Sequence, residues 1–143
     1  MEIRPITPRY AVSPQITVED VPAIAAAGFV KVICNRPNSE VPTEQQSDAI
    51  GAAVRAAGMD YEVLELTHQT MTPENVARQR EMVESVDGPV LAYCASGTRC
   101  SVVWALGQCG EMSPEEILGR TRDAGYQLDG LRPTLEQLCA SAG

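Results

Sequence analysis

The sequence has few aromatic residues and almost no lysine. Aromatic side chains make up 4% of the 143 residues, and Lys31 is the single lysine beside ten arginines. The core is therefore expected to consist mainly of Ala, Val, Leu and Ile, and any positive site should be local and built from guanidinium groups. The net charge of −8 argues against nucleic acid or an anionic membrane surface as a partner.

Long apolar runs and regularly spaced cysteines are also missing. Nothing at the N-terminus resembles a secretory signal, and no apolar run approaches membrane-spanning length. The five cysteines fit a reducing compartment better than a disulfide framework, and no cluster has zinc-ligand spacing. Cys109 and Cys139 are expected to be core or surface residues. These features predict a cytoplasmic protein with no metal and no cofactor, folded as a single domain over residues 1–143.

The apolar pattern alternates between short strands and helices. Residues 1–10 carry two prolines and are expected to form an extended arm or a sheet edge. Strands rich in β-branched and apolar residues are predicted at 11–13, 29–34, 61–66 and 89–94. Helices are predicted to begin near Thr17, Thr43, Thr72, Arg99, Ser113 and Pro133. This order predicts an α/β fold with a central parallel sheet of about four to five strands, flanked by helices on both faces.

One segment joins a strand, a loop of small residues, an arginine and a helix. The strand ends at Cys94, and Arg99 opens the apolar helix after a loop formed by Ala95, Ser96, Gly97 and Thr98. Small residues let successive backbone N–H groups turn towards one point, where the helix dipole adds positive potential. A helix start and a nearby arginine lower a thiol pKa from its usual value of about 8.5. Cys94 is therefore predicted to be a nucleophilic thiolate, although an isolated cysteine is more often a small buried residue.

Other candidate residues lie on loops that converge on Cys94. Ligands of a parallel sheet bind beyond the carboxyl ends of its strands, which places the loops after Ile33 and Leu66 near the thiolate. Arg36 is either an anion clamp at the entrance or a solvated loop arginine. His68, the only histidine, could supply a proton or could simply be solvated.

Two further cysteines could react with Cys94. Cys100 follows Arg99 directly, so its thiol could accept sulfur or resolve an oxidised Cys94 as a disulfide. It could equally be a small residue under the helix start. Cys34 competes for the resolving role because it ends a neighbouring strand.

Several motifs together resemble a known family. They are Asn-Arg-Pro at 35–37 with Glu40, Thr-Pro-Glu-Asn-Val at 72–76, Gly-Pro-Val-Leu-Ala at 88–92 and Cys-Ala-Ser-Gly-Thr-Arg at 94–99. Nearly the whole chain resembles the bacterial beta-lactamase hydrolase-like, phosphatase-like domain family, most weakly before Thr17. The resemblance implies a dual-specificity-phosphatase-like fold. Members of this family have been labelled both phosphatases and sulfurtransferases. Some members are fused to persulfide dioxygenase domains, so the resemblance also implies a persulfide dioxygenase or another sulfide-oxidising protein as a partner.

The spacing around Cys94 separates these two chemistries. Protein tyrosine phosphatases use Cys-x5-Arg, usually with His before the Cys, whereas four residues separate Cys94 from Arg99 and Tyr93 precedes the cysteine. Single-domain rhodaneses commonly have Cys-x-x-Gly-x-Arg, which Cys94, Gly97 and Arg99 reproduce. The 67–72 loop also contains no carboxylate to protonate a leaving alcohol. Sulfur transfer has less need of an acid, because sulfite or a thiolate leaves as a stable anion.

We therefore expect a sulfurtransferase that carries sulfane sulfur as a Cys94 persulfide, from thiosulfate or a persulfide donor to a thiol acceptor. The first alternative is a phosphatase with a phosphocysteine intermediate on Cys94. The second is a thiol redox or persulfide sensor module. All three readings expect a Cys94 thiol open to solvent and an Arg99 guanidinium directed at the same point.

Overall fold

A five-stranded mixed sheet forms the centre of the protein. It is seen in a computed structural model that describes residues 2–142. The strands lie in the order β1-β2-β5-β3-β4, and every neighbouring pair is parallel except β1 with β2. Their bounds are β1 (Arg4–Thr7), β2 (Tyr10–Ser13), β3 (Lys31–Cys34), β4 (Asp60–Val63) and β5 (Val90–Tyr93). The predicted α/β fold is confirmed, and the N-terminal segment forms the antiparallel edge strand; Met1 lies outside the described residues.

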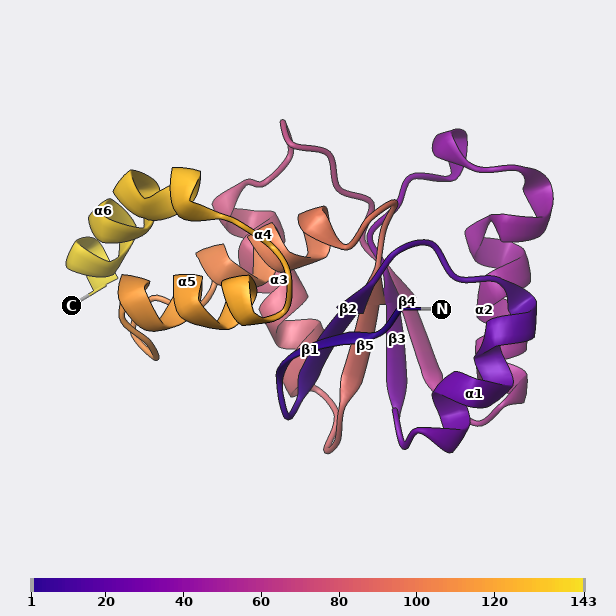
Figure 1. Ribbon diagram of the computed structural model, residues 1–143. Coiled ribbons are helices and arrows are strands. Elements are labelled where there is room, and N and C mark those ends of the chain that lie inside the picture. Colours follow the sequence, from indigo (N-terminus) through magenta and orange to yellow (C-terminus); the bar gives the residue numbers. More distant parts are fainter. Residues whose placement is uncertain (1, 143) are drawn as a thin grey trace.

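Helices cover both faces of the sheet (Figure 1). α1 (Val21–Ala26) and α2 (Ser47–Ala56) pack on one face. The other face carries α3 (Pro73–Glu84), α4 (Thr98–Leu106), α5 (Pro114–Asp123) and α6 (Arg132–Ala142). Successive strand residues point to opposite faces, so Val32 packs with the first group and Ile33 with the second. Two apolar cores result, one on each side of the sheet.

Two helices begin with a side-chain cap at the predicted residue. The Thr72 hydroxyl accepts the Asn75 N–H over 3.2 Å, and Ser113 caps α5 in the same way. The second helix does not begin at the predicted Thr43. Thr43–Gln45 forms a short 3-10 turn, and α2 begins at Ser47 with Gln46 at its N-cap.

Cys109 and Cys139 form a disulfide. It joins the segment after α4 to α6, with the two Cα atoms 4.6 Å apart. Cys34, Cys94 and Cys100 are free thiols. The sequence did not predict this bond; as predicted for core or surface residues, Cys109 and Cys139 both pack, partly buried, against the core on the face of α3 to α6. The cytoplasmic location stays a prediction. Within residues 2–142, no helix combines the length and the apolar character needed to cross a membrane.

Candidate active site

Cys94 follows the last residue of β5 and opens a tight loop. We call residues 94–97 the Cys94 loop. Gly97 has a φ of 93°, a left-handed conformation that side chains rarely adopt, and it turns the chain into α4. The Gly97 N–H then donates to the Cys94 Sγ over 3.1 Å. The strand, the small-residue loop and the helix start therefore bring backbone amides onto the sulfur.

The environment of Cys94 stabilises its thiolate. A hydrogen bond from the Cys100 thiol contributes most, and the backbone N–H groups of Cys100, Ser96 and Gly97 add to it. Burial acts in the opposite direction, and the net effect lowers the pKa of Cys94 to about 5. At neutral pH the side chain is therefore a thiolate, held by donors from its own loop and from the first turn of α4.

Cys100 remains a neutral thiol beneath the loop. Burial raises the pKa of Cys100 well above its usual value, and the neighbouring Cys94 raises it further. The pKa of Cys94 is lowered and that of Cys100 is raised, so the proton of this pair stays on Cys100. The Cys100 carbonyl accepts a hydrogen bond from the Tyr10 hydroxyl over 2.8 Å, which anchors this turn to β2.

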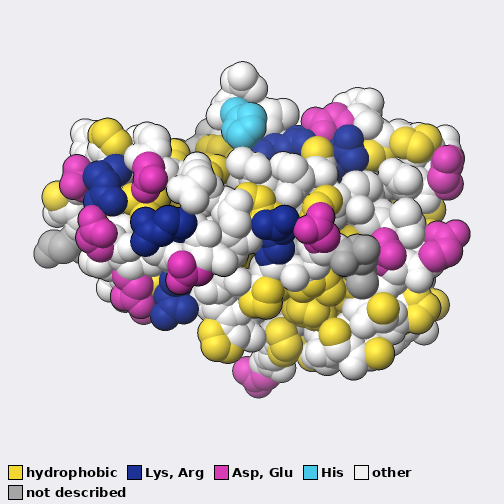
Figure 2. Space-filling model, viewed as in Figure 1, with side chains coloured by type: hydrophobic (Ala, Val, Ile, Leu, Met, Phe, Trp, Pro, Cys, Tyr) yellow, Lys and Arg dark blue, Asp and Glu magenta, His cyan; other side chains and the backbone are white. Residues whose placement is uncertain are grey.

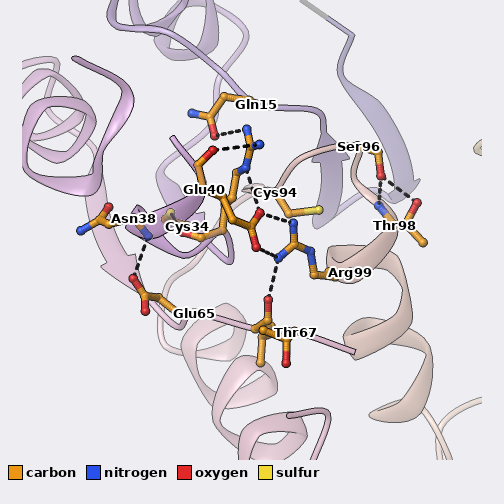
Figure 3. Close-up of polar contacts among 12 residues, drawn as sticks. Gln15, Cys34, Asn38, Glu40, Glu65, Thr67, Cys94, Ser96, Thr98 and Arg99 are labelled. Atoms are coloured by element: carbon orange, nitrogen blue, oxygen red, sulfur yellow. Dashed lines mark hydrogen bonds and ion pairs between the residues drawn. The ribbon is translucent and has the colours of Figure 1, made fainter. Parts of the chain in front are cut away.

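Arg99 is bound to Glu40. Its Nη2 donates to Glu40 Oε1 over 2.8 Å and its Nη1 to Glu40 Oε2 over 2.9 Å, while Nη1 also donates to the Leu66 carbonyl over 2.8 Å. Figure 3 shows the Glu40 carboxylate at the tip of the guanidinium, with the Cys94 sulfur beside it. The loops after β3, β4 and β5 thus meet at Arg99, as the sheet topology predicts.

Arg36 binds the same carboxylate. Its Nε lies 3.2 Å from Glu40 Oε1, and its Nη1 donates to Gln15 Oε1 over 3.3 Å. Hydrogen bonds from Arg99, followed by those from Arg36, lower the pKa of Glu40 despite partial burial. Glu40 is therefore a carboxylate that neutralises two arginines at the carboxyl edge of the sheet.

The site differs in two respects from the sequence-based expectation. The exposed fraction of Cys94 is 0%, so the thiol is not open to solvent. The terminal nitrogens of Arg99 are directed at Glu40 and Leu66. A substrate can reach the sulfur only after the residues around it move, and it then meets an arginine that already has a carboxylate partner.

The structure does not place Cys34 or His68 directly beside Cys94. Cys34 belongs to the core on the α1 and α2 face, whereas Cys94 and Cys100 belong to the opposite core, so Cys100 is the thiol nearest to the nucleophile. His68 is exposed on the loop after β4. Figure 2 shows the histidine protruding above a region where basic and acidic side chains lie next to one another. No group of three or more potential metal ligands occurs in residues 2–142.

Some residues of the site have no local sequence signal. Glu40 stands out in the sequence only as part of a family motif, without a role. Tyr126 donates from its hydroxyl to the Ser96 carbonyl over 2.9 Å, and Tyr10 holds Cys100 from 90 residues away. These partners come from distant segments that only the folded chain brings together.

Comparisons with known proteins agree with this architecture. The sequence profile of the beta-lactamase hydrolase-like protein, phosphatase-like domain family matches residues 2–111. The chain belongs to this family. It is 28% identical over 138 residues to the beta-lactamase hydrolase-like protein of Agrobacterium fabrum. That match covers 95% of the chain and 32% of the relative, so the chain spans about a third of the length of that relative.

Solved structures of similar fold include phosphatases. A Neisseria meningitidis protein described provisionally as a phosphatase is 31% identical, with a TM-score of 0.86 that covers 96% of this chain and 99% of the other. TpbA of Pseudomonas aeruginosa, solved in complex with phosphotyrosine, is 17% identical, with a TM-score of 0.61 that covers 94% of this chain and 90% of the other. The second likeness shows the fold alone. The chain is thus a member of a phosphatase-like family with a phosphatase fold.

Proposed function

We propose that this protein is a cysteine-dependent phosphatase that forms a phosphocysteine on Cys94. The observation that carries the proposal is the Cys94 thiolate, held by amides of its own loop and by the Cys100 thiol. The sequence alone favours sulfur transfer, but the similar phosphatases give more support to the phosphatase alternative. The substrate class is a small phosphate monoester.

The reaction proceeds in two displacements. The thiolate of Cys94 attacks phosphorus, so that an S–P bond forms and the P–O ester bond breaks with its electron pair on the leaving oxygen. Water then attacks the phosphocysteine, the S–P bond breaks, and inorganic phosphate leaves while the thiolate is restored. The 67–72 loop has no carboxylate to protonate the leaving oxygen, so phenols, which leave as stable anions, suit the site best.

Sulfur transfer is the second candidate, and specific observations favour it. Four residues separate Cys94 from Arg99, no carboxylate lies on the 67–72 loop, and a second thiol contacts the nucleophile. In this reaction Cys94 attacks the outer sulfur of thiosulfate; a new S–S bond forms, and the bond to the sulfonate sulfur breaks as sulfite leaves. An acceptor thiolate then attacks the persulfide and takes the sulfur.

Intact mass spectrometry of the covalent intermediate separates these reactions. The protein is mixed with an aryl phosphate or with thiosulfate and quenched in acid. A phosphoryl adduct on Cys94 and turnover of the aryl phosphate, both lost in Cys94→Ser and kept in the matched control Cys34→Ser, support the phosphatase. A single-sulfur adduct without phosphate turnover overturns it in favour of sulfur transfer. Loss of two hydrogen atoms to an added mild oxidant, as a disulfide forms, without turnover of either compound, supports a redox sensor instead.

A further inference from the structure

One carboxylate controls the positive charge beside Cys94. Glu40 pairs with both Arg99 and Arg36, and the exposed fraction of its side chain is 33%, so the pair with Arg99 is shielded from solvent only in part. With the Cys94 thiolate included, two positive and two negative charges meet at this edge of the sheet. The site is therefore close to neutral before any substrate enters.

Glu40 also limits which part of Arg99 can bind a substrate. The bonds to Glu40 and Leu66 use both N–H groups of Nη1 and one N–H group of Nη2. Within residues 2–142, no acceptor bonds the Nε–H or the second N–H of Nη2, which share one edge of the guanidinium. This edge can take one pair of oxygen or sulfur atoms from an anion in a bidentate contact.

We propose that Glu40 is a specificity-determining residue that makes the site prefer singly charged anions over doubly charged ones. A second negative charge on the ligand would meet a site in which the arginine charges are already matched by Glu40 and the thiolate. Coulomb repulsion from Glu40 acts on each charge of the ligand, so its effect on binding free energy is about twice as large for a dianion. For a phosphate ester, the preferred form is the monoanion.

This inference rests on the proposed function only in taking Cys94 and Arg99 as the anion site. It does not depend on which group the thiolate transfers. Glu65 provides a matched control, because it is an exposed carboxylate at the same edge whose Oε2 accepts the Asn38 N–H; among residues 2–142 it has no hydrogen bond or ion pair with Arg36 or Arg99. The change Glu65→Gln removes the same charge and keeps an acceptor for that N–H.

Anion titrations of the intact protein test the inference. The Gly97 amide signal in nitrogen–proton correlation spectra is followed with sodium nitrate and sodium sulfate at constant ionic strength, which gives a dissociation constant for each anion without turnover. In Glu40→Gln, sulfate affinity is expected to rise about tenfold more than nitrate affinity. In Glu65→Gln, the ratio of the two constants should change less than about twofold. The same spectra show whether each variant is folded.

Two results would overturn the inference, and they have different meanings. An equal change for nitrate and sulfate in Glu40→Gln would mean that Glu40 holds Arg99 without selecting charge, and it would leave the proposed function standing. If neither anion shifted the Gly97 amide in the wild type or in Glu40→Gln, the loop would not be an anion site. The proposed function would then fail together with the inference.

Discussion

The Tyr126 hydroxyl donates a hydrogen bond to the Ser96 carbonyl over 2.9 Å and holds the Cys94 loop from the segment that follows α5. A Cβ atom placed on Gly97 would lie 2.1 Å from the Tyr126 hydroxyl oxygen, and the backbone there has a φ of 93°. The loop is thus fixed both by its own left-handed glycine and by an aromatic side chain above it.

Gly97→Ala should therefore disable the site more than Tyr126→Phe does. The alanine adds about 1 to 2 kcal/mol of backbone strain and also clashes with Tyr126, so kcat/KM should fall by about 100-fold or more. Tyr126→Phe removes one hydrogen bond and should cost about tenfold. Aryl phosphate turnover and thermal unfolding of both variants measure the two effects. Equal activity in Gly97→Ala and the wild type would show that the loop geometry is not needed.

The thiolate of Cys94 should titrate near pH 5, and Cys100 should set that value. Because the Cys100 thiol is the largest stabilising contribution, Cys100→Ala should raise the pKa of Cys94, whereas Cys100→Ser keeps a donor and should raise it less. The ultraviolet absorbance of the thiolate, measured against pH and corrected with Cys94→Ala, reports this pKa without any reagent entering the site. An unchanged midpoint in Cys100→Ala would assign the shift to the backbone amides alone.

The lowered pKa of Cys94 also makes folding stability depend on pH. The folded pKa of about 5 lies below the value of about 8.5 for an unfolded thiol. The folded state therefore binds fewer protons between these pH values, and the free energy of unfolding should rise with pH across this window. This contribution is complete above the unfolded pKa and is lost as pH falls through the folded pKa. Chemical unfolding of the wild type and of Cys94→Ser should diverge in this range, with the variant showing the weaker pH dependence.

Leaving-group acidity should govern phosphatase turnover. Aryl phosphates should be hydrolysed at least about 100-fold faster than alkyl phosphates, because the 67–72 loop supplies no carboxylate to protonate an alkoxide. His68→Ala should change aryl turnover by less than about threefold, since a phenolate leaves without a proton. A steep loss of alkyl phosphate turnover in His68→Ala would instead identify His68 as the proton donor.

Reduction of the Cys109–Cys139 disulfide should loosen α6 without removing the nucleophile. The bridge closes a loop with a sequence separation of 30 residues and is worth about 3 to 4 kcal/mol of unfolding free energy on loop-entropy grounds. Cys109→Ser with Cys139→Ser should therefore lower the melting temperature while the thiolate absorbance of Cys94 persists. Thiol counting under denaturing, non-reducing conditions should find three thiols in the wild type. Five thiols would show that the bridge does not form.

The sequence pattern predicts those strands and loops whose geometry is set by residues adjacent in the chain. Short apolar runs place β3 and β5, and the small residues after Cys94 predict its amide loop, because strand and loop geometry depend on adjacent side chains. The partner of Arg99 is not predictable in this way, since Glu40 lies 59 residues earlier and reaches it only after three strands have paired. Residue spacing likewise gives no sign that Cys109 and Cys139 are close enough to bond.

The Arg99–Glu40 contact joins two segments of the chain, the first turn of α4 and the connection after β3, that can change independently in evolution. The nucleophile and its amides come from one continuous stretch of chain, whereas the opposing carboxylate comes from the connection after β3. Substitutions in that connection could retune substrate preference while leaving the reactive stretch intact. Homologous enzymes could therefore diverge in what they process without rebuilding how they process it.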